Sequence, residues 1–176
     1  MRLPLRLLQS FVFLSFSSAS LCLSASAAEQ VIIKYKIFRE SISVAELTTF
    51  VETGETSSAL QSYLNRSGQK PEDVRRTLGK QVDVNVVTLD RALNNRVGNL
   101  VLDQISLAVH PPTNAASRQA IRSALVLSAS QDNKISLIEV IQKYPTSEVE
   151  LEGERISQAY RQISALGGLI DSLPKL

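Results

Sequence analysis

The chain has 176 residues, of which 44% are hydrophobic and 20% charged, with one His, one Cys and no Trp. This composition is typical of a globular protein and excludes disordered, collagen-like and multi-span membrane proteins. The 19 Lys and Arg against 17 Asp and Glu also lack the basic excess of a nucleic-acid-binding domain.

Residues 1–28 are interpreted as a secretory signal peptide, with Arg2 and Arg6 before an apolar stretch diluted by serines. Small residues then place the cleavage site after Ala27 or after Ala28. The alternative is an uncleaved membrane anchor, but the apolar stretch is shorter than the roughly 20 residues that a span needs. We therefore expect export to a periplasm, a lumen or the extracellular space, with the membrane involved only transiently through the signal peptide.

Residues 29–176 are expected to form a single domain. Without the first 28 residues, the chain keeps 148 residues and 17 basic against 17 acidic side chains, so its formal net charge is zero. The one cysteine, Cys22, lies in the segment that is removed, so the exported form can build neither a disulfide nor a thiol nucleophile. A chain of this length can bury a sufficient core without covalent cross-links.

Strands are predicted near the two ends of this domain. Residues 31–38 are rich in β-branched and aromatic side chains, with Lys34 on one face and Ile33 on the other. A turn is expected at 39–41, and Ile42 begins a short return strand. Residues 147–151 alternate in the same way. Since each strand alone would leave its backbone amides unpaired, we expect the two to pair in a small sheet.

The segments between these strands carry the apolar spacing and end signals of helices. Ser43 with Glu46, and Ser136 with Glu139, have the spacing of capping boxes. Helices are expected over 43–54, 58–65, 71–79, 95–109, 117–130, 136–144 and 153–169. Residues 82–86 form either an extended piece or the approach to a helix that Asn85 or Thr88 caps and that reaches Leu93.

One of these helices, over 95–109, is expected to end at Pro111 and Pro112. It should turn a single apolar stripe toward the core, made of Val97, Leu100, Val101, Ile105, Ala108 and Val109. The predicted fold class is therefore α+β and mainly α: a helical bundle with a small sheet that pairs about 31–38 with about 147–151.

No catalytic, cofactor-binding or metal-ligating set is assigned, and no cofactor is expected. His110 is interpreted as a partly exposed histidine at a helix end, because no serine lies in a nucleophile elbow and a lone imidazole makes a poor metal site. Whether His110 has a role stays open, as a minimal hydrolase would have to use it. The glycine-rich loops that bind phosphates are also absent.

Two charged stretches remain. Glu148, Glu150 and Glu152 share one face of the late strand, where like charges repel unless they are solvated, so a solvated outer face is predicted, with an acid–base carboxylate pair as the alternative. Residues 66–80 carry a net charge of +3 and are interpreted as a hydrated helix face. The alternative for that stretch is a surface for an acidic partner or a lipid headgroup.

The segment Val31 to Leu64 resembles a known family through its opening strand, the Ser43-Val44-Ala45-Glu46-Leu47 helix start, Glu52-Thr53-Gly54 and Tyr63-Leu64. The resemblance continues at 121–127, at 137–141 and at Tyr144-Pro145-Thr146. It is to the N-terminal domain of unknown function that precedes an α/β-hydrolase domain in exported cyanobacterial proteins. This chain has Lys36-Ile37 where the family often has Gly-Pro, so we expect the strand to continue there.

The resemblance implies a free-standing accessory domain without the hydrolase, and it transfers no catalytic residue. The leading hypothesis is a non-enzymatic exported domain that binds another protein, plausibly an α/β hydrolase. The alternatives are a carrier of a lipid or small apolar ligand, which requires an apolar cavity of several hundred Å³, and a minimal hydrolase. No nucleic acid is expected as a partner, and the sequence does not indicate an oligomeric state.

Overall fold

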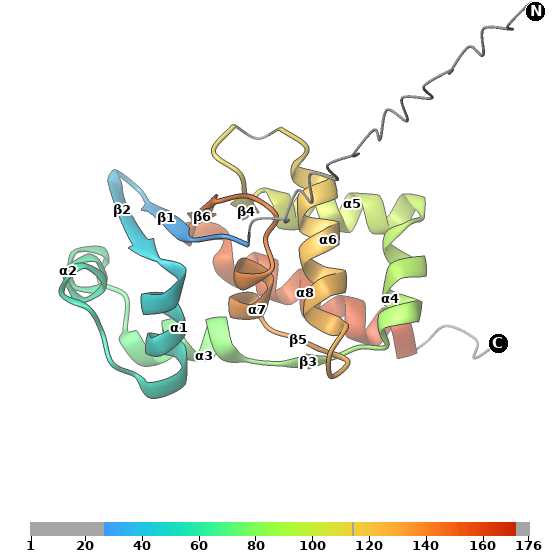
Figure 1. Ribbon diagram of the computed structural model, residues 1–176, viewed down its shortest axis with the longest axis horizontal. Coiled ribbons are helices and arrows are strands. Elements are labelled where there is room, and N and C mark those ends of the chain that lie inside the picture. Colours follow the sequence, from blue (N-terminus) through green and yellow to red (C-terminus); the bar gives the residue numbers. More distant parts are fainter. Residues whose placement is uncertain (1–26, 114, 172–176) are drawn as a thin grey trace, which may run out of the picture.

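The computed structural model describes residues 27–113 and 115–171, so the predicted signal peptide lies outside the described residues except for its last two positions. The chain (Figure 1) begins with β1 (Gln30–Tyr35), β2 (Phe38–Ser43), α1 (Val44–Thr53), α2 (Ser58–Ser67), α3 (Pro71–Gly79) and β3 (Val82–Asp83). It continues with α4 (Val86–Leu93), α5 (Arg96–Ser106), β4 (Val109–His110), α6 (Ser117–Ala129) and β5 (Lys134–Ile135). It ends with α7 (Leu137–Gln142), β6 (Glu148–Glu152), the 3-10 turn η1 (Gly153–Arg155) and α8 (Ile156–Asp171). The fold is mainly α with a small mixed sheet, as predicted.

The larger sheet has the strand order β2-β1-β6-β4. β1 pairs with β6 in parallel, Val31 opposite Val149, which confirms the predicted pairing of the two end strands. β2 and β4 are both antiparallel to their neighbours. β6 therefore lies between β1 and β4 and joins the first strand of the domain to a segment from its middle.

The β1–β2 hairpin corrects the expectation of one strand over 31–38. The chain turns at Lys36 and Ile37, where Lys36 takes a left-handed conformation with φ 54°, and Ile37 is 91% exposed at the tip. Two-residue hairpin turns favour Asn or Gly at such positions. This turn has neither residue, and the alternating pattern of 31–38 continues through it. The sequence therefore did not indicate that the chain reverses direction here.

Most helix boundaries follow the local signals. Both capping boxes form, with the Ser43 and Ser136 hydroxyls accepting from the amides of Glu46 and Glu139. The Asn85 side chain accepts from the Thr88 amide and begins α4, so both alternatives for 82–93 occur in part: a two-residue strand and then a helix. In the second sheet, β3 pairs with β5, a strand that the sequence did not indicate.

The segment 95–109 is the second correction. Its helix ends at Ser106, and Val109 and His110 instead form β4 against Leu151 and Glu150. The predicted apolar stripe is also rotated: Val97 and Leu100 are 61% and 66% exposed. The inward face consists of Gly98, Leu102 and Ile105. Gly98 lies so close to α4 that a Cβ there would be 2.1 Å from the carbonyl oxygen of Ala92, which fixes this side of α5 against its neighbour.

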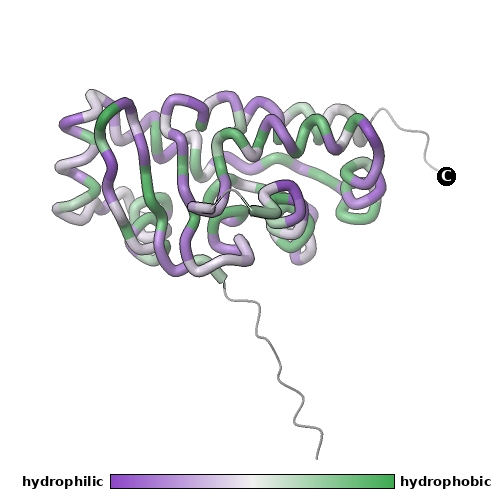
Figure 2. The backbone as a smooth tube through the Cα atoms, turned by 90° about the horizontal axis from the view of Figure 1, so that it is seen from above, coloured by the Kyte–Doolittle hydropathy of each residue, from purple (hydrophilic) through white to green (hydrophobic). Residues whose placement is uncertain are grey.

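The core lies between one face of the sheet and the helices, and it includes Val31, Ile33, Val109, Val149 and Leu151 from the strands. α1, α2 and α3 lie at the end of the molecule that holds the hairpin, and α4, α5 and α6 at the other end (Figure 1). Hydrophobic and hydrophilic residues alternate around the helical turns in Figure 2, as expected for helices with one buried side. Across the described residues, no helix combines the length and hydropathy required to cross a bilayer.

Candidate functional site

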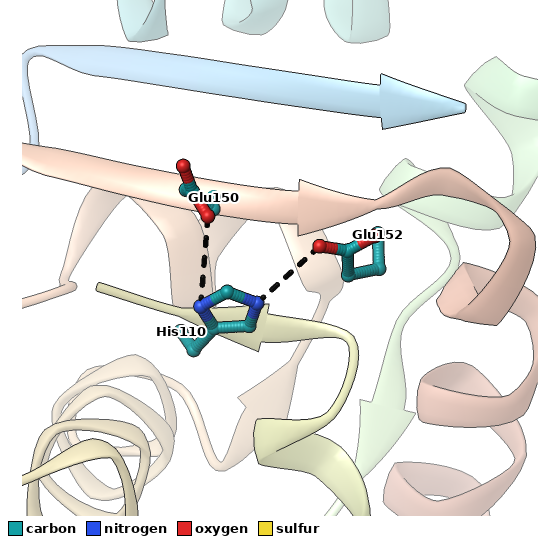
Figure 3. A group of neighbouring side chains, drawn as sticks. All are labelled: His110, Glu150 and Glu152. Carbon is teal, nitrogen blue, oxygen red and sulfur yellow. Dashed lines mark ion pairs between the residues drawn. The ribbon is translucent and has the colours of Figure 1, made fainter. Parts of the chain in front are cut away.

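Three titratable side chains meet on the sheet face turned away from the core (Figure 3). His110 on β4 is the cross-strand partner of Glu150 on β6, and Glu152 follows two residues later on the same side of that strand. One ligand atom from each of the three lies within 4.8 Å of the others. Glu150 and His110 are only 4% and 7% exposed, so this is a largely buried ionisable cluster.

Two cations from the β1–β2 hairpin complete the cluster. The Lys34 ammonium donates to Glu150 and lies 3.4 Å from a Glu152 oxygen, while an Arg39 nitrogen is 3.1 Å from the other Glu150 oxygen. The hydrogen bond to Glu150 raises the pKa of Lys34 above its ordinary value, although partial burial acts in the opposite direction. Glu150 thus has a cation on each of its two oxygens, which is how a buried carboxylate is stabilised.

The His110 ring is positioned by its immediate neighbours. Its Nδ1 lies 3.0 Å from the carbonyl oxygen of Pro111 and 3.9 Å from Glu150. Its Nε2 lies 3.6 Å from Glu152. Because a carbonyl only accepts, Nδ1 is the donor to Pro111, and Nε2 faces the Glu152 carboxylate. Within the described part of the chain, the hydrogen-bond and ion-pair partners of this ring are one carbonyl and two carboxylates, and none is a serine hydroxyl.

This arrangement limits what the cluster can do chemically. His110, Glu150 and Glu152 could offer a divalent metal ion three ligands, so His110 is not isolated from other ligating groups as the sequence suggested. Lys34, however, already bridges the two carboxylates, and a metal ion would have to displace that ammonium. The geometry therefore fits an internal ion-pair network better than a metal centre.

Two expectations about these residues were wrong. His110 is a buried strand residue and not a partly exposed helix end, since its backbone pairs with β6. Glu148, Glu150 and Glu152 do share a face, but only Glu148 is exposed, because Lys34, Arg39 and His110 surround Glu150. The sequence did indicate one partner of Glu150, because Lys34 lies on the polar face of a strand that was expected to pair with the strand of the glutamates. It did not indicate Arg39, because a turn was predicted at 39–41.

A separate cavity of about 140 Å³ lies at the hairpin end, between α2, α3, the strands and the start of α8. It is smaller than the several hundred Å³ that a lipid carrier requires. Two larger hollows, of about 490 and 340 Å³, are lined mainly by charged and polar side chains and are unsuited to an apolar ligand.

The basic stretch 66–80 is not one uniformly hydrated face. Arg66 lies 2.5 Å from Glu40, Arg75 donates to the carbonyls of Val51 and Glu52, and Lys80 stacks over Tyr160. Much of the basic charge in this stretch therefore serves contacts within the molecule. Arg75, for example, supplies hydrogen bonds to carbonyls near the end of α1.

The outer side of α5 carries large apolar side chains in contact with solvent. Val97 and Leu100 of α5 and Leu107, the residue that caps its C-terminal end, are 61%, 66% and 46% exposed and fall on one side of the helix. We call these three residues the α5 stripe. The opposite side of the same helix is in the core, so α5 carries large apolar side chains on its outer side as well, beside polar residues such as the exposed Gln104.

Taken together, the described residues define a mainly helical α+β domain with a buried ion-pair network on its small sheet. Residues 27–152 match the family model described as "Alpha/beta hydrolase of unknown function (DUF1400)", and the chain belongs to this family. Neither the curated proteins nor the solved structures contain a significant match.

Proposed function

We propose that this chain is a non-enzymatic, exported accessory domain that binds an α/β hydrolase. The family description associates the domain with an α/β hydrolase, and the resemblance noted in the sequence is to a domain that precedes one. The described sheet has one parallel strand pair and belongs to a mainly helical fold, whereas an α/β fold is built on a mostly parallel sheet.

The α5 stripe is the observation that carries this proposal. Leu100 is 66% exposed, so a polar residue in its place would cost the folded protein little or no stability. Three large apolar side chains along one side of α5 therefore favour a surface that another molecule covers. A hydrolase surface with an apolar patch would bury this stripe on binding.

The lack of enzymatic activity is supported by the contacts of His110. An acyl-transfer mechanism requires a base whose free nitrogen reaches a nucleophile. In this chain the nitrogen that does not face the Pro111 carbonyl faces Glu152. We expect purified protein to hydrolyse p-nitrophenyl acetate no faster than its His110→Ala variant; a rate that disappears in the variant would overturn this part of the proposal.

The interface is tested by a matched pair of variants. Tagged protein recovered from the exported fraction of its native cell should bring down a protein with an α/β-hydrolase fold, and purified Leu100→Asp should lose at least tenfold in affinity for it. Ile37→Asp is the control, because Ile37 is an even more exposed apolar residue on the distant hairpin tip. Recovery of no hydrolase, or equal binding by Leu100→Asp and the unchanged chain, would contradict the proposal.

Export is tested separately by sequencing the amino terminus of the cellular protein. Ala28 is only 6% exposed and belongs to the core cluster, so cleavage after Ala27, which keeps Ala28, is the expected outcome. A protein that begins at Met1 would overturn the proposed processing.

A further inference from the structure

The cavity at the hairpin end has an apolar inner wall. Leu47, Leu60 and Leu64 of α1 and α2 line it, together with Ile33 of β1, Leu78 of α3 and Leu151 of β6. Each of these side chains is at most 8% exposed, so they belong to the core itself. The cavity of about 140 Å³ is partly open to solvent and reaches from the surface to these core side chains.

The volume indicates the size of molecule that would fit. An apolar cavity of about 150 Å³ in a protein core stays free of water and accepts benzene. This cavity, at about 140 Å³, has almost the same volume, with leucine and isoleucine side chains in its inner wall and polar groups such as Gln69, Thr77 and Ser157 in the rest. It can hold one six-membered ring but not an acyl chain.

Tyr63 supplies a polar group in this wall. Its side chain on α2 is 5% exposed and lines the cavity, and its hydroxyl forms no hydrogen bond with another residue in the described part of the chain. The Tyr63 oxygen is not one of the fully buried polar atoms without a partner, so it is accessible from the cavity, where a ligand oxygen can accept its hydrogen bond. Burial raises the pKa of Tyr63 to about 12, so the hydroxyl keeps its proton and is available as a donor.

Gly153 leaves space beside this hydroxyl. A Cβ at position 153 would lie 3.3 Å from the Tyr63 hydroxyl oxygen and 2.9 Å from the Lys34 carbonyl oxygen. The absence of a side chain there lets η1 approach the strand and tyrosine closely. Tyr63 and Gly153 both line the cavity, so its polar and apolar parts adjoin.

The charge of the remaining wall selects against anions. Asp73 of α3 lines the cavity, and the structure places no Lys or Arg among the described lining residues. A carboxylate ligand would therefore meet a like charge without a cation to balance it. A neutral molecule does not have this cost.

From these features we propose that the cavity beside Tyr63 binds a small uncharged aromatic molecule carrying one hydroxyl or carbonyl oxygen, which accepts a hydrogen bond from the Tyr63 hydroxyl. The ring fills the space between the leucines, and the oxygen accepts a hydrogen bond from Tyr63 in the same wall. This site is independent of the α5 stripe, which lies at the other end of the molecule.

The test uses phenol as the probe and the full exported chain, followed by amide chemical shifts in NMR. Phenol should bind saturably with a Kd of about 1 mM or tighter, with the largest shifts at cavity residues such as Leu60 and Gly153. Benzene should bind about fivefold more weakly, since it lacks the hydrogen bond. Benzoate should not bind.

Variants identify the contact. Tyr63→Phe keeps the ring and should reduce phenol affinity to that of benzene, while Tyr160→Phe, at a tyrosine outside the cavity wall, should leave it unchanged. Leu64→Phe should block both probes by occupying the space, and Tyr63→Phe remains decisive if Leu64→Phe fails to fold. Absence of saturable binding, shifts located elsewhere, benzoate binding equal to phenol, or phenol affinity unaffected by Tyr63→Phe would each overturn the proposal.

Discussion

Glu150 has 4% of its surface exposed, and at the scale of single residues its stability depends on the charges beside it. Its two cationic partners differ in their surroundings. The Lys34 side chain is 29% exposed and contacts both Glu150 and Glu152, whereas the Arg39 side chain is 60% exposed and contacts Glu150. An exposed ion pair contributes little, because water competes for both groups. Lys34 should therefore contribute more to folding than Arg39.

We predict that Lys34→Met lowers the free energy of unfolding by about 2–3 kcal/mol, because Glu150 is left buried with less compensation. Arg39→Met should cost less than about 1 kcal/mol. Urea unfolding monitored by circular dichroism measures both values. Lys34→Met combined with Glu150→Met should recover part of the loss, since no uncompensated charge remains. Equal effects of the two single variants would contradict this account.

The same contact predicts a pH dependence. The Glu150 hydrogen bond raises the pKa of Lys34 above 10.5, so the folded state holds this proton more tightly than the unfolded state. The resulting stabilisation is complete below the unfolded-state pKa and is lost as pH rises through the folded-state pKa. Lys34→Met should therefore remove part of the alkaline loss of stability in urea unfolding measured at successive pH values above 9.

The same cluster shows which properties of a single residue the sequence predicts: the face of the strand on which it lies, but not its burial. The alternation of Glu148, Val149, Glu150 and Leu151 correctly gave the two faces of β6. It could not give the burial of Glu150, because that depends on Lys34 and Arg39, more than 100 residues away in the chain. Periodicity specifies a face, whereas burial is decided by what long-range pairing brings onto that face.

At the scale of elements, local signals were sufficient where a helix has its own caps. α1 and α7 begin at capping boxes, and the Gly54 that ends α1 has φ 86°, as the sequence indicated. β4 and β5 could not be predicted, since two residues show no periodicity and are held in place only by β6 and β3. The orientation of α5 was predicted wrongly because the buried side was assigned from large apolar residues alone, and Gly98 was not expected to face the core.

We predict that Gly98→Ala destabilises the protein by at least about 2–3 kcal/mol, although alanine normally favours a helix over glycine. The added Cβ would lie 2.1 Å from the Ala92 carbonyl oxygen and 2.6 Å from the Leu93 Cα, and backbone atoms cannot move aside as a flexible side chain can. Gly168→Ala in α8 is the matched control, because nothing lies within 4 Å of a Cβ there.

The control should gain about 0.5–1 kcal/mol from helix propensity. Thermal unfolding of both variants, followed at 222 nm, measures the difference. If Gly98→Ala were as stable as the unchanged chain, α4 and α5 would not be packed at this close separation.

At the scale of the whole molecule, the family match and the folded unit have different ends. The match stops at residue 152, where β6 ends, so it includes every strand of both sheets. α8 lies beyond it, yet Ala159, Ile163 and Leu166 of this helix are at most 2% exposed. α8 packs against α3 at one end of the molecule and against α4 and α5 at the other. The core of the matched segment is therefore incomplete without the helix that follows it.

We predict that a shortened chain ending at residue 152 loses its cooperative thermal transition, because removing α8 exposes the apolar surfaces of α3, α4 and α5 that it covers. Two substitutions within α8 test the same idea in the full-length chain. Ile163→Asp, at a side chain 1% exposed, should cost more than about 3 kcal/mol, whereas Arg161→Asp, at an exposed position of the same helix, should change stability by less than about 0.5 kcal/mol. Calorimetry distinguishes the outcomes: a shortened chain that unfolds in a single transition near the temperature of the full-length chain would mean that residues 27–152 fold independently and that α8 is an addition to the domain.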